Sequence, residues 1–177
     1  MTTDNKVRLR EKRLDDAGVD YAWKTDAELA QLDAAPVLSI GFQQYLADYA
    51  RELRYPSPSR ERFAIETPDG KHIGNCTYYG VDKEKGEAEL GIMIGNHTYW
   101  DKGYGTSAVN ALIRHILQRT KLIRIYLKTL VSNKRAQKCF VKCGFTPCGH
   151  LNYDGYDFVL MEIKRKPWLK QDRGRGY

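Results

Sequence analysis

The stretch that decides the fold reads Gly91-Ile-Met-Ile-Gly95, then Asn96 to Tyr99, then Trp100-Asp-Lys-Gly-Tyr-Gly-Thr-Ser107. Gly103 and Gly105 leave backbone N–H groups accessible where a predicted helix begins, at the positive end of its dipole. Such groups suit a phosphate or pyrophosphate, and Lys102 adds a cation. The stretch lacks the Gly-Lys-Ser/Thr ending of a P-loop and the three-glycine spacing of a Rossmann fingerprint, so those nucleotide folds are disfavoured. By itself, Gly-Tyr-Gly is also typical of a plain loop before a helix.

Three predicted strands precede this stretch, at residues 62–66, 72–79 and 87–94. The turn Pro68-Asp-Gly70 and a charged turn over 82–86 separate them, and such short connections indicate antiparallel hairpins. Side chains alternate along a strand. In the third strand, one face therefore holds Ala88, Leu90, Ile92 and Ile94, and the other holds Glu87, Glu89, Gly91 and Met93.

Two helices and three strands are predicted after the stretch. Apolar residues recur at helical spacing over 105–119, and the strand over 123–128 that follows this crossover should run parallel to the strand at 87–94. A helix over 133–143 ends at Gly144. The turn Asp154-Gly155 joins strands 145–153 and 156–163 into a hairpin.

The first 60 residues are predicted to hold a strand at 7–10 and two helices. The helices cover 16–24 and 42–53, and Ser39 is positioned to cap the second. The complete order is β-α-α-β-β-β-α-β-α-β-β. It predicts an α/β fold with a central mixed antiparallel and parallel sheet flanked by helices.

Length and charge predict one domain over residues 1–163 and a basic C-terminal tail over 164–177. The tail carries six basic residues against Asp172 alone, and so holds +5 of the net +7 of the 177-residue chain. Such a tail is typical of a solvated, frayed terminus. A salt-sensitive contact with RNA or the ribosome is the alternative. Without a long apolar stretch or a signal-peptide pattern, the protein is expected to be cytoplasmic and to make no membrane contact.

The four cysteines form no Cys-x-x-Cys pair. Cys139, Cys143, Cys148 and His150 have an unfamiliar spacing for a zinc site, so buried reduced thiols are the favoured interpretation and no metal is expected.

Three linked motifs make the chain resemble the GNAT superfamily of acetyl-CoA-dependent N-acetyltransferases, in particular its RimJ/RimL-like branch. The motifs are Glu89-Leu-Gly91 with Ile94; Tyr99-Trp100 with Lys102-Gly-Tyr-Gly-Thr106 and Ala108; and Asn133, Ala136, Phe140, Gly144 and Phe145. The resemblance covers about residues 60 to 163 by motif. It implies the GNAT acyl-CoA N-acyltransferase fold, direct acetyl transfer to an amine, and acetyl-CoA as co-substrate.

The resemblance also implies where acetyl-CoA binds. The strand at Ile92, Met93 and Ile94 would splay from the following parallel strand at a bulge, leaving backbone groups to pair with pantetheine. The pyrophosphate would lie on Lys102, Gly103, Tyr104, Gly105, Thr106 and Ser107. Asn133 would reach the pantetheine arm, a role compatible with capping its helix, and Phe140 completes the expected site.

Direct transfer needs a base and a dipole for the oxyanion. A strand N–H near Met93 suits the oxyanion. Glu89 is the candidate base, directly or through water, because it shares a strand face with Met93; holding a substrate cation or a neighbouring arginine is its alternative role. Phe140 departs from the family, which often carries Tyr there as general acid. Ala136 also stands where some relatives have Ser. No general acid is assigned: the reaction would run more slowly, or use water, Cys139 or a tyrosine of the last hairpin such as Tyr153.

Residues 16 to 60 and the last hairpin are expected to select the substrate. An aromatic and acidic pocket for a cationic amine would use Tyr21, Trp23, Tyr45, Tyr49 and Tyr55 with Asp20, Asp26 and Asp48, although core packing is simpler for the helix at 42–53. We expect an enzyme, with a homodimer as its assembly, that acetylates a protein N-terminus or a polyamine-like small molecule. The alternatives are a non-catalytic CoA-binding regulatory module and a ribosome- or RNA-associated protein.

Overall fold

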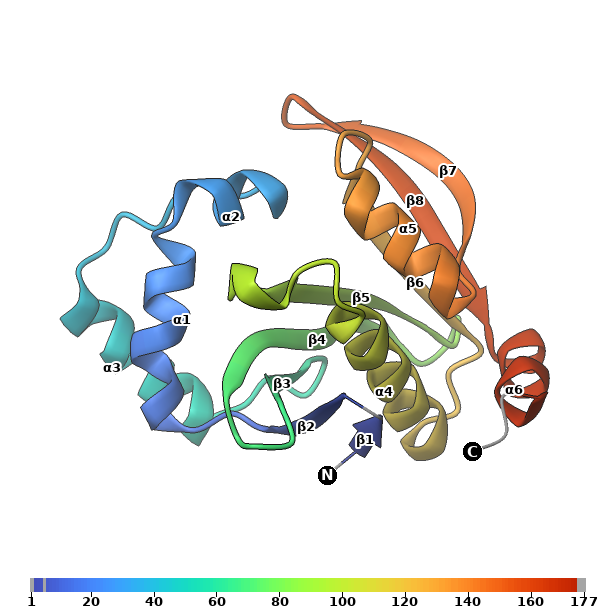
Figure 1. Cartoon of the computed structure of the whole chain (residues 1–177), viewed down its shortest axis with the longest axis horizontal. Helices are drawn as coiled ribbons and strands as arrows, with labels where there is room; N and C mark the ends of the chain where they lie inside the picture. The colour runs from blue at the N-terminus through green and yellow to red at the C-terminus, as the bar shows by residue number, and fades with distance from the viewer. Residues whose placement is uncertain (1, 5, 175–177) are drawn as a thin grey trace.

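The computed structural model describes residues 2–4 and 6–174, in which the strands form one eight-stranded sheet of order β1-β2-β3-β4-β5-β6-β8-β7 (Figure 1). The strands are β1 (Thr2–Asp4), β2 (Val7–Glu11), β3 (Glu61–Glu66), β4 (His72–Asp82), β5 (Glu87–Ile94), β6 (Arg124–Leu130), β7 (Thr146–Tyr153) and β8 (Tyr156–Lys164). The helices are α1 (Ala17–Lys24), α2 (Ala27–Leu32), α3 (Phe42–Arg54), α4 (Tyr104–Arg119), α5 (Lys134–Cys143) and α6 (Arg165–Gly174), with short 3-10 turns η1 (Leu14–Asp16) and η2 (His97–Tyr99). Strands β5 and β6 run parallel, and the other described pairs are antiparallel. The predicted mixed α/β sheet is confirmed.

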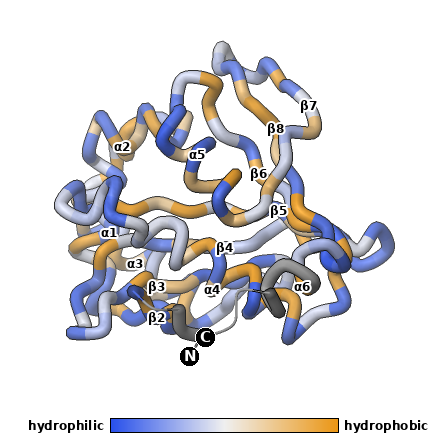
Figure 2. The backbone as a smooth tube through the Cα atoms, turned by 45° about the vertical axis from the view of Figure 1, so that its right-hand side comes forward, coloured by the Kyte–Doolittle hydropathy of each residue, from blue (hydrophilic) through white to orange (hydrophobic). Residues whose placement is uncertain are grey.

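The main core lies between α4 and one face of the sheet. Ala88 and Leu90 on β5 are buried together with Ile113 and Ile116 of α4, as the predicted alternation along β5 requires. Figure 2 shows hydrophobic residues recurring along α4 and along the strands that it covers. This packing fixes the position of the first turn of α4 relative to the end of β5.

The other face of β4 and β5 is turned toward α1 and α3, which form a small second core around Ala17, Tyr45 and Tyr49. The indole of Trp23 on α1 packs so closely on Gly95 that a Cβ at Gly95 would lie 2.2 Å from the ring. The absence of a side chain at Gly95 therefore allows α1 to dock against the end of β5.

The parallel ladder between β5 and β6 is short. It pairs Glu87 with Arg124 and ends with Glu89 opposite Tyr126, although β5 continues to Ile94. The predicted splay is therefore present. The register shift lies on the other side of β5, where β4 has an extra residue between Tyr79 and Asp82 and Gly80 adopts a φ of 60°.

Three local features differ from the sequence-based expectations. Helix α2 and strand β1 were not expected, because each is too short to show a clear period. The N-cap of α3 is Gly41 rather than Ser39. Ile123, expected in a strand, lies before β6 and is 59% exposed, while Ile125 and Leu127 face the core.

The C-terminal segment also differs from the expected frayed tail. Residues 165–174 form α6, and Trp168 is buried at 3% exposure in the main core. The Arg165 guanidinium donates to the carbonyls of Leu117, Thr120 and Leu122, at 2.6, 3.1 and 3.0 Å. Arg165 thus satisfies carbonyl groups at and just beyond the C-terminal end of α4. The domain limit at 163 stays a prediction.

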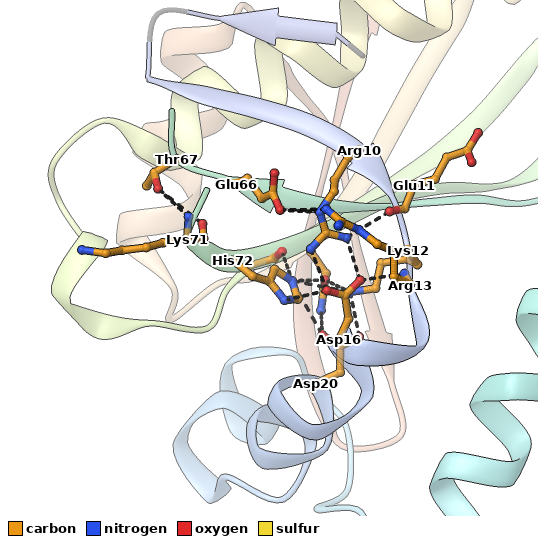
Figure 3. Close-up of polar contacts among 12 residues, drawn as sticks. Arg10, Glu11, Lys12, Arg13, Asp16, Asp20, Glu66, Thr67, Lys71 and His72 are labelled. Carbon is orange, nitrogen blue, oxygen red and sulfur yellow. Dashed lines mark hydrogen bonds and ion pairs between the residues drawn. The ribbon is translucent and has the colours of Figure 1, made fainter. Parts of the chain in front are cut away.

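A buried ionic network joins β2 to η1, α1, β3 and β4 (Figure 3). The Arg10 guanidinium binds both oxygens of Asp16, at 2.7 and 2.8 Å, and also pairs with Glu66. Lys12 pairs with Asp20 at 2.8 Å and donates to Asn75 at 2.6 Å. Because each buried charge has a partner, the network fixes α1 against the sheet edge.

Asp16 gives a test of this network. Burial opposes its ionisation, but the hydrogen bonds from Arg10 and the Arg13 N–H outweigh burial and hold the pKa of Asp16 well below its usual range. We expect Asp16→Asn to lower the free energy of unfolding by about 2 kcal/mol at pH 7, measured by urea denaturation. A lowered folded-state pKa stabilises above the unfolded value of about 3.9, so the difference from wild type should shrink as the pH falls below about 4.

Asp15→Asn is the matched control, because Asp15 is exposed and adjacent. It should change the unfolding free energy by less than about 0.5 kcal/mol. Equal effects of the two substitutions would contradict a stabilising role for the Asp16 pair.

Candidate active site

Two cavities meet where β5 diverges from β6. The first, here the glycine-loop cavity, has a volume of about 240 Å³ and lies between α2, the end of β5, the first turn of α4 and α5. The second, here the tyrosine cavity, has a volume of about 690 Å³ and lies between α1, α3, β4 and β5. Asp33, Ile92 and Met93 line both cavities, so molecules bound in the two cavities can meet at β5. In Figure 1, α2 and α5 lie on opposite sides of this opening.

The glycine loop presents the start of α4 to the first cavity. Gly103 is the N-cap and has a φ of 84°, a left-handed conformation that favours glycine. The first helical bond runs from the Ser107 N–H to the Gly103 carbonyl at 3.0 Å, so the N–H groups before Ser107 have no helical acceptor. At Gly105 a Cβ would lie 3.4 Å from the Cys139 sulfur. The loop therefore offers backbone donors to an anion between α4 and α5.

The predicted loop residues divide into two groups. The cavity is lined by Gly103, Gly105 and Thr106, but not by Lys102, Tyr104 or Ser107. The Lys102 ammonium donates to the Thr98 carbonyl at 2.7 Å, and Tyr104 packs against Tyr99 with their ring centres 4.9 Å apart. Ser107 is buried in the helix. In this structure the side chains of Lys102, Tyr104 and Ser107 hold the loop in place, while the backbone of the loop faces the cavity.

Ile92, Met93 and Ile94 all line the cavity, and the strand geometry separates their roles. The Met93 carbonyl faces Gly74 of β4, since a Cβ at Gly74 would lie 2.2 Å from it. Backbone groups of successive strand residues point to alternate edges, so those of Ile92 and Ile94 point to the edge that β6 has left. The Ile94 carbonyl accepts from the Trp100 indole at 2.6 Å. Ile92 is thus the residue whose backbone groups are best placed for an extended ligand.

Helix α5 forms the opposite wall. The Asn133 carboxamide accepts from the Ala136 N–H at 3.1 Å and caps the helix while lining the cavity, which makes the two expected roles geometrically compatible. Phe140 lines the cavity and packs edge-on against Phe145. The wall also carries cations, at Arg135, Lys138 and Lys142. This wall therefore combines an apolar surface with positive charge.

The tyrosine cavity combines tyrosines with charged groups. Its lining includes Tyr45, Tyr49 and Tyr79 with Asp20, Asp33, Asp48 and Glu52, and with Lys12, Lys24, Arg60 and Arg62. Most of the acids have partners. Asp20 pairs with Lys12 and accepts from the Tyr49 hydroxyl at 2.9 Å, while Glu52 pairs with Arg60 and Arg62.

Glu89, the predicted base, lies at the vertex of the splay and lines neither cavity. It is 8% exposed and pairs with the Lys128 ammonium at 3.3 Å. Tyr79 lies directly opposite on β4 and lines the tyrosine cavity. Burial and the adjacent Glu89 carboxylate raise the pKa of the Tyr79 phenol. Tyr79 therefore connects Glu89 to the tyrosine cavity.

The expected acceptor residues are only partly brought together. The cavity includes Asp20, Tyr45, Asp48 and Tyr49, but not Tyr21, Trp23, Asp26 or Tyr55. Trp23 packs on His72 at a ring distance of 4.9 Å, and Asp26 caps α2 by accepting from the Leu29 N–H at 2.9 Å. Tyr55 is 68% exposed. Of the alternative acids, Tyr153 is 69% exposed at the hairpin tip, whereas Cys139 lines the glycine-loop cavity.

Sequence reasoning missed the contribution of α2 and of Lys6. Leu29, Leu32 and Asp33 line the glycine-loop cavity. The Asp26 cap before an apolar pair was the available signal for α2. The Lys6 ammonium, just before β2, donates to the Lys102 carbonyl at 2.8 Å and thereby stabilises the glycine loop. No local sequence pattern predicts this contact.

Known proteins resemble this chain along most of its length. A family model described as an acetyltransferase (GNAT) domain matches residues 6–146. An uncharacterised N-acetyltransferase, p20, of Bacillus licheniformis is 25% identical over 169 residues, which cover 94% of each chain. A spermine/spermidine N(1)-acetyltransferase of Bacillus subtilis is 29% identical over 100 residues, 54% of this chain and 66% of that one.

A solved structure has the same fold. The spermidine N-acetyltransferase of Vibrio cholerae, solved in complex with CoA and spermine, superimposes with a TM-score of 0.83 at 20% identity. The match covers 94% of this chain and 99% of the Vibrio chain.

Cys139 gives a test of the glycine-loop cavity. The hydrogen bond with the Cys143 thiol, opposed by burial and assisted by Thr106, lowers the pKa of Cys139 to about 7. We expect iodoacetamide to alkylate Cys139 at a rate that rises with pH and levels off above about pH 7, because the thiolate is the nucleophile. Acetyl-CoA should protect Cys139 but not the exposed Cys148, which serves as the internal control in peptide mass spectrometry. Equal protection of both thiols, or of neither, would contradict binding in this cavity.

Proposed function

The chain belongs to the acetyltransferase (GNAT) family and is an acetyl-CoA-dependent N-acetyltransferase, and from this premise we propose that its acceptor is a primary amine of a small, cationic, polyamine-like molecule. The resemblance inferred from the three motifs is confirmed at the level of the family, the enzyme class and the co-substrate, which leaves the non-catalytic alternative without support. The RimJ/RimL-like branch, the protein N-terminus as acceptor, the homodimer, the RNA contact and the cytoplasmic location stay predictions. No helix in the described part of the chain is long and apolar enough to cross a membrane.

The observation that carries the proposal is the tyrosine cavity. Tyrosine rings attract ammonium groups through their faces, and carboxylates do so by charge. The cavity presents three tyrosines and four acids together with four lysines and arginines. Three of the acids are paired with cations, whereas Asp33 makes no ion pair with any described residue and so offers its charge to a bound amine. Its volume of about 690 Å³ suits a small molecule. The partial likeness to a spermine/spermidine acetyltransferase supports the same substrate class.

Acetyl-CoA is proposed to occupy the glycine-loop cavity. The N–H groups of Tyr104, Gly105 and Thr106 at the start of α4 would hold the pyrophosphate, and the cations of α5 would neutralise the phosphates. The pantetheine arm would pair with the backbone of Ile92 as an added strand. Its thioester would then reach the point where the two cavities meet.

The transfer is a direct reaction between the two bound molecules. The amine nitrogen attacks the thioester carbonyl, the oxygen gains negative charge, and the C–S bond breaks. Strand geometry favours the N–H of Ile92 or Ile94 over that of Met93 as oxyanion donor, because Met93 faces β4. Glu89 is proposed to take a proton from the nitrogen through Tyr79, and water to protonate the thiolate, since Phe140 has no proton to give.

An amine panel tests this function. We expect CoA release from acetyl-CoA with spermidine, spermine and putrescine, and at least about tenfold lower kcat/KM with peptide N-termini. Glu89→Gln and Tyr79→Phe should each lower kcat about 100-fold, because they interrupt the same proton path. Tyr45→Phe is the matched control, since it removes a hydroxyl from the same cavity without contacting Glu89.

Two results would contradict this scheme. Turnover of peptide N-termini without turnover of any polyamine would show that the acceptor is a protein N-terminus and not a polyamine. A Tyr79→Phe enzyme as active as Tyr45→Phe would show that Tyr79 does not carry a proton to Glu89.

A further inference from the structure

Asp33 has a position that no other acid among the described residues shares. It lines both the glycine-loop cavity and the tyrosine cavity, together with Ile92 and Met93 of β5. Asp20, Asp48 and Glu52 line the tyrosine cavity but not the glycine-loop cavity. Asp33 is therefore part of the region where an amine in one cavity would meet a thioester in the other.

Asp33 also differs from the other acids in its bonding. Asp20 is held by Lys12, Asp48 pairs with Arg51 at 2.7 Å, and Glu52 pairs with two arginines. The Asp33 carboxylate makes no hydrogen bond or ion pair with any residue in the described ranges, and its side chain is accessible to solvent. Its negative charge is thus available to a ligand.

The backbone around Asp33 is fixed despite this accessibility. Asp33 caps the C-terminus of α2, where the Ala34 N–H donates to the Gln31 carbonyl at 3.2 Å and the Ala35 N–H donates to the Ala30 carbonyl at 3.0 Å. These two bonds form a Schellman motif, which places the next residue in the left-handed region. That residue is Ala34, with a φ of 50°, instead of the usual glycine. Alanine costs about 1 kcal/mol there, and such strain is often found at functional sites.

The electrostatic surroundings connect Asp33 to the proposed proton path. Desolvation by the surrounding protein raises the pKa of Asp33, and Lys24 opposes this effect. The charge of Asp33 also contributes to raising the pKa of Tyr79, which lies opposite Glu89. A cation between Asp33 and Tyr79 would relieve the unfavourable field at both groups.

From this placement we propose that Asp33 is a further catalytic residue, which binds the ammonium form of the acceptor and takes its first proton. The inference deepens the proposed function, on which it rests for an amine acceptor in the tyrosine cavity. Two protons leave the nitrogen during acetylation. One is lost when the ammonium becomes a nucleophilic amine, and this proton passes to the Asp33 carboxylate. The second leaves the nitrogen after attack and passes through Tyr79 to Glu89, while the thiolate takes a proton from water and departs as CoA.

Asp33→Asn tests the proposal, with Asp15→Asn as the matched control. Both variants lose one exposed carboxylate, but Asp15 lines neither the tyrosine cavity nor the glycine-loop cavity. We expect Asp33→Asn to lower kcat/KM at least about 100-fold, and Asp15→Asn to change it less than about twofold. Acetyl-CoA affinity, measured by calorimetry, should stay within about threefold of wild type in both variants.

The basicity of the acceptor amine and the pH supply two measurements that would not change if Asp33 had only a structural role. The wild-type kcat/KM should fall as the pH drops through the pKa of Asp33, and this limb should be absent in Asp33→Asn. The loss should shrink at least about tenfold for an acceptor amine of pKa near 8, which is already partly neutral, compared with a lysine-like amine near 10.4.

The inference fails if Asp33→Asn is as active as Asp15→Asn, if its loss of kcat/KM is independent of amine basicity, or if it loses acetyl-CoA affinity. The assay uses whichever primary amine the wild-type enzyme turns over. Absence of polyamine turnover in the wild type would therefore refute the proposed substrate class, whereas a fully active Asp33→Asn would refute only the role of Asp33.

Discussion

The early end of the β5–β6 ladder is the constraint on which the rest of the site depends. Parallel strands normally bond along their whole shared length, but here pairing stops at Glu89 while β5 runs on to Ile94. The unmatched edge of β5 would be costly if it were buried without partners. It is instead exposed to a cavity, where Trp100 takes one carbonyl and a bound pantetheine arm would take the neighbouring groups. The site thus follows from an incomplete sheet.

The elements around this opening are held from two directions. The main core fixes α4 and β5, so the glycine loop has little freedom to move away from β5. On the other face, the buried ion pairs of Arg10, Lys12, Asp16 and Asp20 fix α1 to β2 and β4. The main core and these ion pairs together hold the tyrosine cavity and the glycine-loop cavity in a fixed relative position. Direct transfer between two bound molecules requires such a fixed arrangement.

The sequence predicted those parts of the fold that have a clear period or a strong turn signal. Alternation along 87–94 identified the face of β5 that packs on α4, and Gly144 and Asp154-Gly155 marked the ends of α5 and of the hairpin. The predicted loop backbone faces the cavity, but the orientation of Lys102 depends on the Thr98 carbonyl, a contact set by the local turn. Asp33 could not be found from sequence, because its position depends on a two-turn helix and on the distance between α2 and β5 in three dimensions. Glu89 was identified from strand alternation, but alternation does not show that Tyr79 covers it.

The basic C-terminal segment has a consequence for α4. The Arg165 guanidinium binds three carbonyls at and just beyond the C-terminal end of this helix, and the glycine loop presents N–H groups without helical acceptors at the other end. Opposite charges at the two poles of a helix each interact favourably with its dipole. The cation at one pole belongs to the chain, whereas the anion at the other would arrive with the co-substrate. The positive charge that complements the C-terminal end of α4 is therefore part of the fold, and the negative charge that complements its N-terminal end would come with the bound co-substrate.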